Sequence, residues 1–390
     1  MKVEGSFPVL LVTMSQSQNH PQASKPIIKP TLECIGKGAC GSVWAISSYD
    51  DIDFLPSSHV IKRGDGSKYR SVSNEQLIQT HLLSKLRRIS GLFDHSYRVD
   101  FPEHKALIQP DSPAWSVYLP GLPSGYSPCQ ALVNERIMPA PRAVRRLLVQ
   151  KFWNVPEDQI VSILDDRTND HCLIRPYLGR RRTETKPLNS RLPKTMRKTL
   201  RNFPLHIDQM EELGLAVGEY AMAMADALAF MFWIAEVDAC DVEFVLARPR
   251  PSSSGHSSTR TPASQPHLGN RKFNDGVLGL HTLWVLDFDC CQRLLMDMEG
   301  VEHAAEKFVK NDSYYPRLSK NERDMLLWKI FKRRFLRTSD AILLGEKTSE
   351  GLGRSQFPGL LIKRIEEKCP VKNGGLSGGD YGENEGSAAV

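Results

Sequence analysis

The chain contains a glycine pattern that could bind phosphate groups. Gly36, Gly38 and Gly41, followed by Val43, match the pattern Gly-x-Gly-x-x-Gly-x-Val in full. Glycines allow a tight hairpin whose backbone N–H groups approach phosphate oxygens, because no side chain stands in the way. A purely structural hairpin would carry the same pattern. Since Val43 begins a strand-like run and not a helix, the pattern disfavours the phosphate turn of a dinucleotide-binding Rossmann fold.

A lysine and a glutamate follow at spacings that could complete a phosphate site. Lys62 ends the short strand-like run 59–62 and could neutralise phosphate charge. Glu75 lies thirteen residues further on, in a stretch with helical spacing of apolar residues, and could hold the lysine by an ion pair. Alone, either residue could be an ordinary surface charge. Together with the glycines, they favour phosphate binding.

Three carboxylates form a second candidate group further along the chain. Asp238 and Glu243 stand five residues apart after a long apolar stretch, and Asp287 follows the apolar run 283–286. A buried carboxylate without a binding partner costs free energy, so Asp287 is the strongest functional candidate of the three. Asp238 could instead end the preceding helix. The neighbouring Asp241 has the position of a turn or cap residue.

These carboxylates resemble the motifs of the protein-kinase-like fold. Asp238 matches the aspartate of His-Arg-Asp-x-x-x-x-Asn, Glu243 its asparagine, and Asp287 the aspartate of Asp-Phe-Gly. The resemblance implies that a nucleotide binds between two lobes, with the glycines over its phosphates and Lys62, oriented by Glu75, in contact with them. It also implies that Glu243 and Asp287 hold Mg²⁺ and that Asp238 accepts the proton of a substrate hydroxyl. ATP and Mg²⁺ are therefore the expected cofactors.

Several positions depart from a protein kinase. Glu236 and Val237 replace His-Arg, Cys240 stands where a lysine is common, and Glu243 replaces asparagine. Asp289 replaces the glycine of Asp-Phe-Gly, which resembles the small-molecule kinases of the aminoglycoside-phosphotransferase type. No Ala-Pro-Glu follows, so a platform for a protein substrate is not expected. Two functions stay open: phosphoryl transfer from ATP to a small molecule, and a catalytically inactive pseudokinase that acts on a protein partner as an interaction or regulatory module.

Five stretches also resemble a family of uncharacterised fungal proteins. The resemblance covers roughly residues 31–330, and the shared domain of this family has no assigned activity. Some members are labelled zinc-finger proteins, but the eight cysteines here show no Cys-x-x-Cys spacing that would support a zinc site. The stretches that carry the resemblance are 134–139, 173–179, 203–206, 238–246 and 283–289.

The expected elements form an α+β, two-lobed, protein-kinase-like fold. An N-lobe at 31–138 combines short strands with one helix, and a mainly helical C-lobe follows at 139–345. Apolar residues at helical spacing predict a long, largely buried helix over 209–236. The other predicted elements are strands at 42–46, 59–62, 106–108, 131–133, 244–246 and 283–286, and helices at 74–89 and 142–153.

Segments of a different composition flank and interrupt these lobes. Residues 1–30 form a polar arm that is expected to be disordered, and Met14 is a second candidate start after Met1. The segment 249–275, which begins with a serine- and proline-rich stretch, is expected to be a disordered insertion. Without this segment, the spacing between Glu243 and Asp287 is close to that of the corresponding residues in a kinase. A C-terminal extension and flexible tail are expected over 346–390.

Charge and composition limit the class of function. The 390 residues carry a formal net charge of +6, and the stretch 179–201 alone holds nine basic residues against one acidic residue. A solvated connector is the preferred interpretation of this stretch, so a nucleic-acid-associated regulatory factor ranks last. No apolar run approaches the ~18–20 residues that span a bilayer. The sparse cysteines predict reduced thiols and a cytoplasmic or nuclear location.

Overall fold

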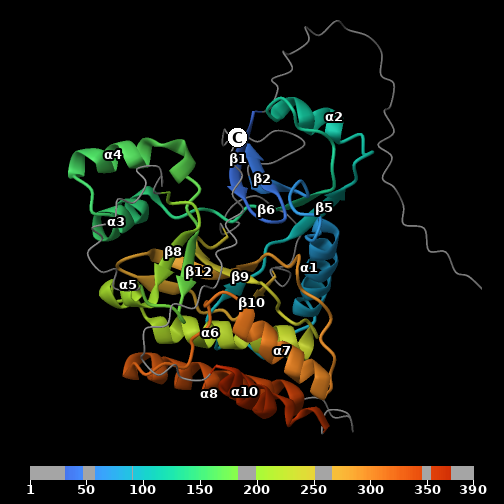
Figure 1. Cartoon of the computed structure of the whole chain (residues 1–390), viewed down its shortest axis with the longest axis vertical. Helices are drawn as coiled ribbons and strands as arrows, with labels where there is room; N and C mark the ends of the chain where they lie inside the picture. Colours follow the sequence, from blue (N-terminus) through green and yellow to red (C-terminus); the bar gives the residue numbers. More distant parts are fainter. Residues whose placement is uncertain are drawn as a thin grey trace, which may run out of the picture.

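Two β-sheets divide the computed structural model into two lobes, with helices packed on each (Figure 1). The structure describes residues 31–46, 58–89, 91–182, 199–250, 266–344 and 353–369. The chain has the α+β class that its sequence predicts, and the two sheets agree with a two-lobed fold. The arm predicted at 1–30, most of the basic stretch 179–201 and the tail after 369 lie outside the described residues.

The first lobe is a five-stranded antiparallel sheet in the order β1-β2-β3-β6-β5. Its strands are β1 (Leu32–Lys37), β2 (Ser42–Ile46), β3 (His59–Arg63), β5 (His104–Ile108) and β6 (Ala131–Glu135). Helix α1 (Val72–Leu86) packs against β5 and β6, and the Ser71 side chain caps it by accepting a hydrogen bond from Asn74 N–H. The short helices α2 (Trp115–Tyr118) and η1 (Leu119–Gly121) pack into a core that contains Trp44 and Ile61.

The second lobe contains a mixed sheet in the order β10-β4-β12-β9-β7-β8, with β11 paired to β12 beside this path. Its strands are β4 (Val99–Asp100), β7 (Ile174–Tyr177), β8 (Phe203–His206), β9 (Glu243–Ala247), β10 (His267–Leu268), β11 (Phe273–Asp275) and β12 (Gly279–Leu286). In the antiparallel pair β9 and β12, Glu243 stands opposite Leu286. This register places Glu243 at the same end of the sheet as Asp287, the residue that follows β12.

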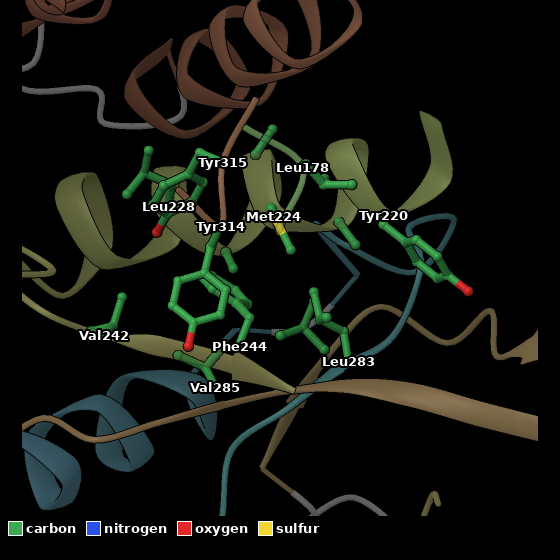
Figure 2. Close-up of a cluster of buried hydrophobic side chains, with 14 of the residues drawn as sticks. Leu178, Tyr220, Met224, Leu228, Val242, Phe244, Leu283, Val285, Tyr314 and Tyr315 are labelled. Atoms are coloured by element: carbon green, nitrogen blue, oxygen red, sulfur yellow. The ribbon is translucent and has the colours of Figure 1, made fainter. Parts of the chain in front are cut away.

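The second sheet is supported by a layer of helices. Helix α6 (Val217–Ala229) lies between that sheet and the helices α8 (Glu322–Leu344) and α10 (Phe357–Lys368) (Figure 1). The remaining helices are α3 (Arg142–Phe152), α4 (Glu157–Asp165), η2 (Arg167–Asn169), α5 (Ile207–Glu212) and α7 (Met298–Lys310). Tyr220, Met224 and Leu228 of α6 pack toward Phe244 and Leu283 of the sheet (Figure 2). Each such buried side chain contributes ~1.5–3 kcal/mol, so this layer fixes β9 and β12 in place.

The long helix predicted over 209–236 is three consecutive elements, so the prediction of one continuous helix was wrong. Helix α5 ends just before Gly214, whose φ of +69° lies in the left-handed region and interrupts the helical ladder. After α6 the chain continues as a π-helical turn, Phe230–Ile234. Contrary to the sequence expectation, Val217–Ile234 is long and apolar enough to cross a membrane by length and composition. However, 72% of that window is buried inside the protein, as in a core helix.

The last part of the predicted insertion belongs to the fold, which corrects the expectation of disorder over 249–275. Residues 266–275 contain β10, which pairs with β4, and β11, which pairs with β12. Phe273 is 3% exposed and stacks on Tyr97. The prediction failed here because single apolar residues in a polar stretch give no periodic signal. The preceding residues 251–265 lie outside the part of the chain that the structure describes.

A buried ion pair between α6 and α8 leads to a first testable prediction. Asp226 is 1% exposed and accepts hydrogen bonds from Arg334 Nε and Nη2, each at 2.7 Å, and from the Thr338 hydroxyl at 2.6 Å. Asp226→Ala should lower the free energy of unfolding by about 3 kcal/mol, because both partners lose a buried acceptor. Urea denaturation followed by circular dichroism measures this loss. Lys310→Ala removes only the exposed pair with Glu306 and should cost less than about 0.5 kcal/mol, so equal losses would contradict the prediction.

Candidate functional site

A cavity of about 390 Å³ lies between the two lobes. Eight of the nine site residues predicted from the sequence line it: Gly36, Gly38, Gly41, Val43, Lys62, Glu75, Glu243 and Asp287. The ninth, Asp238, is not part of the cavity wall. The fold therefore gathers residues from the first strands, from α1 and from the ends of β9 and β12 around one space.

Lys62 connects the two lobes inside this cavity. Its Nζ lies 2.6 Å from Glu75 Oε2 and 2.7 Å from Asp287 Oδ1. Burial lowers the pKa of Lys62, but the two carboxylates outweigh burial and hold this pKa well above its ordinary value. Burial raises the pKa of Glu75 to about 7, against the opposing effect of Lys62. One ammonium group therefore links helix α1 of the first lobe with the loop after β12 of the second.

The glycine hairpin at 36–41 is held by a second loop, at 63–67, which no sequence pattern indicated. Gly66 N–H donates to the Cys40 carbonyl at 3.1 Å, and Ser67 N–H donates to the Ala39 carbonyl at 2.7 Å. In the same loop, Asp65 Oδ1 accepts a hydrogen bond from the backbone N–H of Ser42, at 2.8 Å. These three contacts hold the hairpin against the second loop.

The close approach of the two loops leads to a second prediction, for Gly66→Ala. A Cβ at this position would lie 2.4 Å from the Ala39 carbonyl oxygen and 2.6 Å from Gly41 N. Both are backbone atoms, so the loops must separate, and we expect a loss of about 1–3 kcal/mol in stability, seen as a lower melting temperature. Gly38→Ala is the matched control, because its Cβ would meet no atom within 4 Å. If Gly66→Ala melts at the wild-type temperature, the second loop does not clamp the hairpin.

Glu243 lies in the cavity wall and already has a cationic partner. Its Oε2 accepts a hydrogen bond from Arg175 Nη2 at 2.6 Å, from the neighbouring strand β7. Burial raises the pKa of Glu243 to about 7, against the opposing effect of Arg175. Arg175 could not be identified from the sequence, because no local spacing connects a residue on β7 with one on β9.

Asp238 lies outside the cavity, which corrects its assignment as the group that accepts a substrate proton. Its side chain is 0% exposed. Oδ1 accepts hydrogen bonds from the backbone N–H of Cys240 at 3.1 Å and of Gln292 at 2.9 Å, and Oδ2 lies 2.9 Å from His303 Nε2. The carboxylate therefore joins two loops and does not face a ligand between the lobes.

Asp241 lies in a turn, as its sequence position predicts, and it also lines the cavity. Its Oδ2 lies 2.6 Å from Arg70 Nη2, while Arg70 Nη1 donates to Asp289 Oδ1 at 2.9 Å. Burial raises the pKa of Asp241, against the opposing effect of Arg70. Arg70 comes from the segment before α1, so this pair of contacts is a second link between the lobes that the sequence did not reveal.

Left-handed backbone conformations concentrate around the cavity. The described non-glycine residues with positive φ are Asn202, Glu236, Ala239, Asp241 and Asp287. Of these, Asn202, Asp241 and Asp287 line the cavity. Each such conformation costs of order 1–3 kcal/mol and persists only where the surroundings impose it, often at functional sites. This strain favours a functional role for the loops at 236–241 and 287.

Part of the cavity wall is apolar. Val43 and Val60 contribute from the first lobe, Leu173 and Leu286 from the second, and Ile137 from the segment that connects the lobes. Apolar side chains on two sides, with backbone at the connecting segment, are suited to a planar ring.

Residues 283–347 match the sequence model of a family described as "Zinc finger protein", whose domain is of unknown function. The match runs from β12 through Asp287 and α7 to just beyond α8, and it supports a relation to an uncharacterised family. Searches of the curated proteins and of the solved structures found no significant match. Among the described residues, no three His, Cys, Asp or Glu side chains are grouped so that they could hold a metal ion.

Proposed function

We propose that this protein binds a nucleotide between its lobes, in the manner of the protein-kinase-like fold, with the triphosphate between the glycine hairpin and Lys62. The observation that carries the proposal is the pairing of Lys62 with both Glu75 and Asp287 beside the hairpin. In kinases, a lysine held by a helix glutamate, a glycine-rich hairpin and an aspartate after a strand together position a triphosphate. Both the sequence spacing and the contacts support the proposal.

The tip of the hairpin offers free donors for phosphate oxygens. Gly38 and Gly41 use their N–H groups on each other's carbonyls, at 2.9 and 3.1 Å. The N–H groups of Ala39 and Cys40 donate to no described residue, and both residues line the cavity. Two adjacent N–H groups in a turn form a concavity that suits an anion. The apolar part of the wall would hold the base.

The charges in the cavity favour a cation that enters with the nucleotide. Five cationic and six acidic side chains line the cavity: Lys37, Lys62, Arg70, Arg136 and Arg175, against Glu75, Glu135, Asp241, Glu243, Asp287 and Asp289. With all of them ionised, the cavity wall has a net charge of −1, which does not attract a bare triphosphate. Mg²⁺ commonly binds one or two carboxylates together with substrate phosphates, so Asp287 and Glu243 fit such an ion. When bound, it would neutralise phosphate charge.

Phosphoryl transfer to the hydroxyl of a small molecule is the reaction that these groups would support. The hydroxyl oxygen forms a bond to the terminal phosphorus, the bond from that phosphorus to the bridging oxygen breaks, and the diphosphate leaves. Asp241 would accept the hydroxyl proton, because it lines the cavity and burial raises its pKa toward that of a useful base. Positioning and charge neutralisation supply most of the catalysis in such transfers.

A catalytically inactive nucleotide-binding module is the second candidate. Two observations favour it: Arg175 already pairs with Glu243, and Asp238 is buried away from the cavity. In this case the nucleotide would fix the two lobes relative to each other for a protein partner. A nucleic-acid-binding role gains little from the described arginines of the basic stretch, because Arg181 and Arg182 form ion pairs with acidic residues.

Calorimetric titration of the full chain with Mg-ATP tests the proposal. We expect binding that Asp287→Ala weakens by at least about tenfold, because the variant loses a carboxylate that contacts Lys62. Asp340→Ala, on the exposed side of α8, is the matched control and should bind as the wild type does. No binding, or equal binding by Asp287→Ala, would overturn the proposal. ADP release with a pool of small hydroxyl compounds would then support phosphoryl transfer, and binding without release would support the inactive module.

A further inference from the structure

Two buried amide oxygens on the cavity wall have no hydrogen-bond partner. Gln79 of α1 is 1% exposed and Asn134 of β6 is 7% exposed, and both line the cavity. Gln79 Oε1 and Asn134 Oδ1 accept no hydrogen bond. Buried polar atoms are paired in the great majority of cases, so two unpaired acceptors in one cavity point to a ligand that donates hydrogen bonds to them.

The orientation of the Gln79 amide is fixed by its other contact. Its Nε2 donates to the Pro102 carbonyl at 2.7 Å, which leaves the oxygen as the atom without a partner. Gln79 also follows Glu75 by one helical turn, so the two side chains lie on the same face of α1. The unpaired oxygen is therefore an acceptor on the face that carries the partner of Lys62.

Asn134 lies where the first lobe meets the connecting segment. Strand pairing sets it opposite Val60 on β3, which contributes to the apolar wall. The residues that follow it lead to Ile137, also in the wall. A ring held by these apolar side chains would thus present one edge to the Asn134 amide.

The carboxylate of Glu135, which follows Asn134 in the chain, already has hydrogen-bond donors within the protein. Glu135 accepts hydrogen bonds from Arg250 Nε at 2.6 Å and from the backbone N–H of Glu103 at 2.9 Å. Arg250 also binds Asp100, at 2.6 Å, and lies over the ring of Trp284. These contacts occupy the Glu135 carboxylate, whereas the two amide oxygens are still able to accept a hydrogen bond from a ligand.

We infer that Gln79 and Asn134 select a nucleotide whose base carries an exocyclic amino group, such as adenine, over one with a carbonyl oxygen at that position. The inference rests on the proposed function. An amino group can donate an N–H to such an oxygen, whereas a carbonyl oxygen would face an acceptor and be repelled. The Asn134 amide can rotate to present its NH₂ group, but Gln79 cannot, because Pro102 holds its nitrogen. Gln79 therefore sets the preference for a donor.

Binding of three triphosphates tests this inference: ATP, inosine triphosphate with a 6-carbonyl, and purine riboside triphosphate with no 6-substituent. We expect the wild type to bind ATP about tenfold or more tightly than either analogue, since a site built for a hydrogen-bond donor rejects ligands without one. In Asn134→Leu and in Gln79→Leu, the ratio of ATP to inosine triphosphate affinity should fall toward one. Gln76→Leu makes the same change on α1 outside the cavity wall and should keep the wild-type ratio.

The outcomes separate the inference from the proposed function. If the wild type binds ATP and inosine triphosphate equally, or if the leucine variants keep the wild-type ratio, the inference fails and nucleotide binding stands. If the wild type binds none of the three, the proposed function fails and the inference falls with it. Should either leucine variant not fold, the comparison of the three nucleotides on the wild type still decides.

Discussion

Lys62→Met should weaken Mg-ATP binding by about 100-fold, which corresponds to about 2.7 kcal/mol. The variant loses the cation that would contact the phosphates, and it leaves Glu75 and Asp287 without the ammonium group that lies 2.6 and 2.7 Å from them. Asp287 would then face the incoming triphosphate without a neighbouring ammonium group. Isothermal titration calorimetry of the full chain measures the change.

Two further variants show whether Lys62 acts on the ligand directly. Lys105→Met makes the same substitution at an exposed position on β5 and should leave the affinity unchanged. Glu75→Gln should weaken binding less than Lys62→Met, and the double variant should bind as Lys62→Met does, because Glu75 acts through the lysine. Fully additive losses would instead assign Glu75 a separate contact with the ligand.

The same lysine variant should change how stability depends on pH. Burial raises the pKa of Glu75 from 4.5 to about 7 even though Lys62 opposes it, so removal of Lys62 should raise this pKa further. A carboxyl whose pKa is higher in the folded protein contributes stability that is complete below its unfolded value and is lost as the pH rises through its folded value. Chemical denaturation should therefore show a larger loss for Lys62→Met at pH 8 than at pH 6. Equal losses at both pH values would mean that Lys62 does not control the protonation of Glu75.

Contacts that follow from local order were accessible from the sequence. The order strand, strand, helix around Gly36, Lys62 and Glu75 predicted an ion pair between the last two, which is present at 2.6 Å. Its role in holding phosphate stays a prediction. The register of β9 and β12 likewise brings Glu243 and Asp287 to one end of a sheet, and the kinase-like resemblance had assigned both to one ion.

Contacts between distant segments were not accessible in this way. Arg70, Arg175 and Gln79 each occur in a stretch where a polar residue is unremarkable, and their partners or cavity positions arise from the packing of separate segments. Neither periodicity nor spacing encodes such partners. The break at Gly214 shows the same limit for the fold, because the apolar pattern continues through a residue whose φ of +69° ends the helix.

The position of Asp238 illustrates why spacing alone assigns the wrong carboxylate to the cavity. A five-residue distance to Glu243 places a residue near the strand but does not determine where its side chain points. Ala239 and Asp241 have φ values of 50° and 60°, so the backbone reverses between the two aspartates. As a result, Asp238 points into the protein and Asp241 lies in the cavity wall.

Asp238→Ala should therefore act on stability, lowering the free energy of unfolding by about 3 kcal/mol. The backbone N–H groups of Cys240 and Gln292 both lose their acceptor, in a place where the carboxylate is 0% exposed. Asp241→Asn should cost less than about 1 kcal/mol, because the Asp241 side chain is 44% exposed and its pair with Arg70 is partly screened by water. Urea denaturation of both variants measures the difference.

For ligand binding and turnover, the order should be reversed: substitution of Asp241 should have the larger effect and substitution of Asp238 the smaller one. Asp238→Asn keeps the shape of the side chain, so its folded fraction should bind Mg-ATP within about twofold of the wild type, an effect of less than ~0.5 kcal/mol. If the chain transfers phosphate, Asp241→Asn should slow turnover about 100-fold or more, because it removes the proposed proton acceptor. Asp238→Asn should leave turnover per folded molecule unchanged. If a folded Asp238→Asn variant loses turnover while Asp241→Asn stays active, the catalytic role belongs to Asp238. The loop at 236–241 would then have to change conformation when substrate binds.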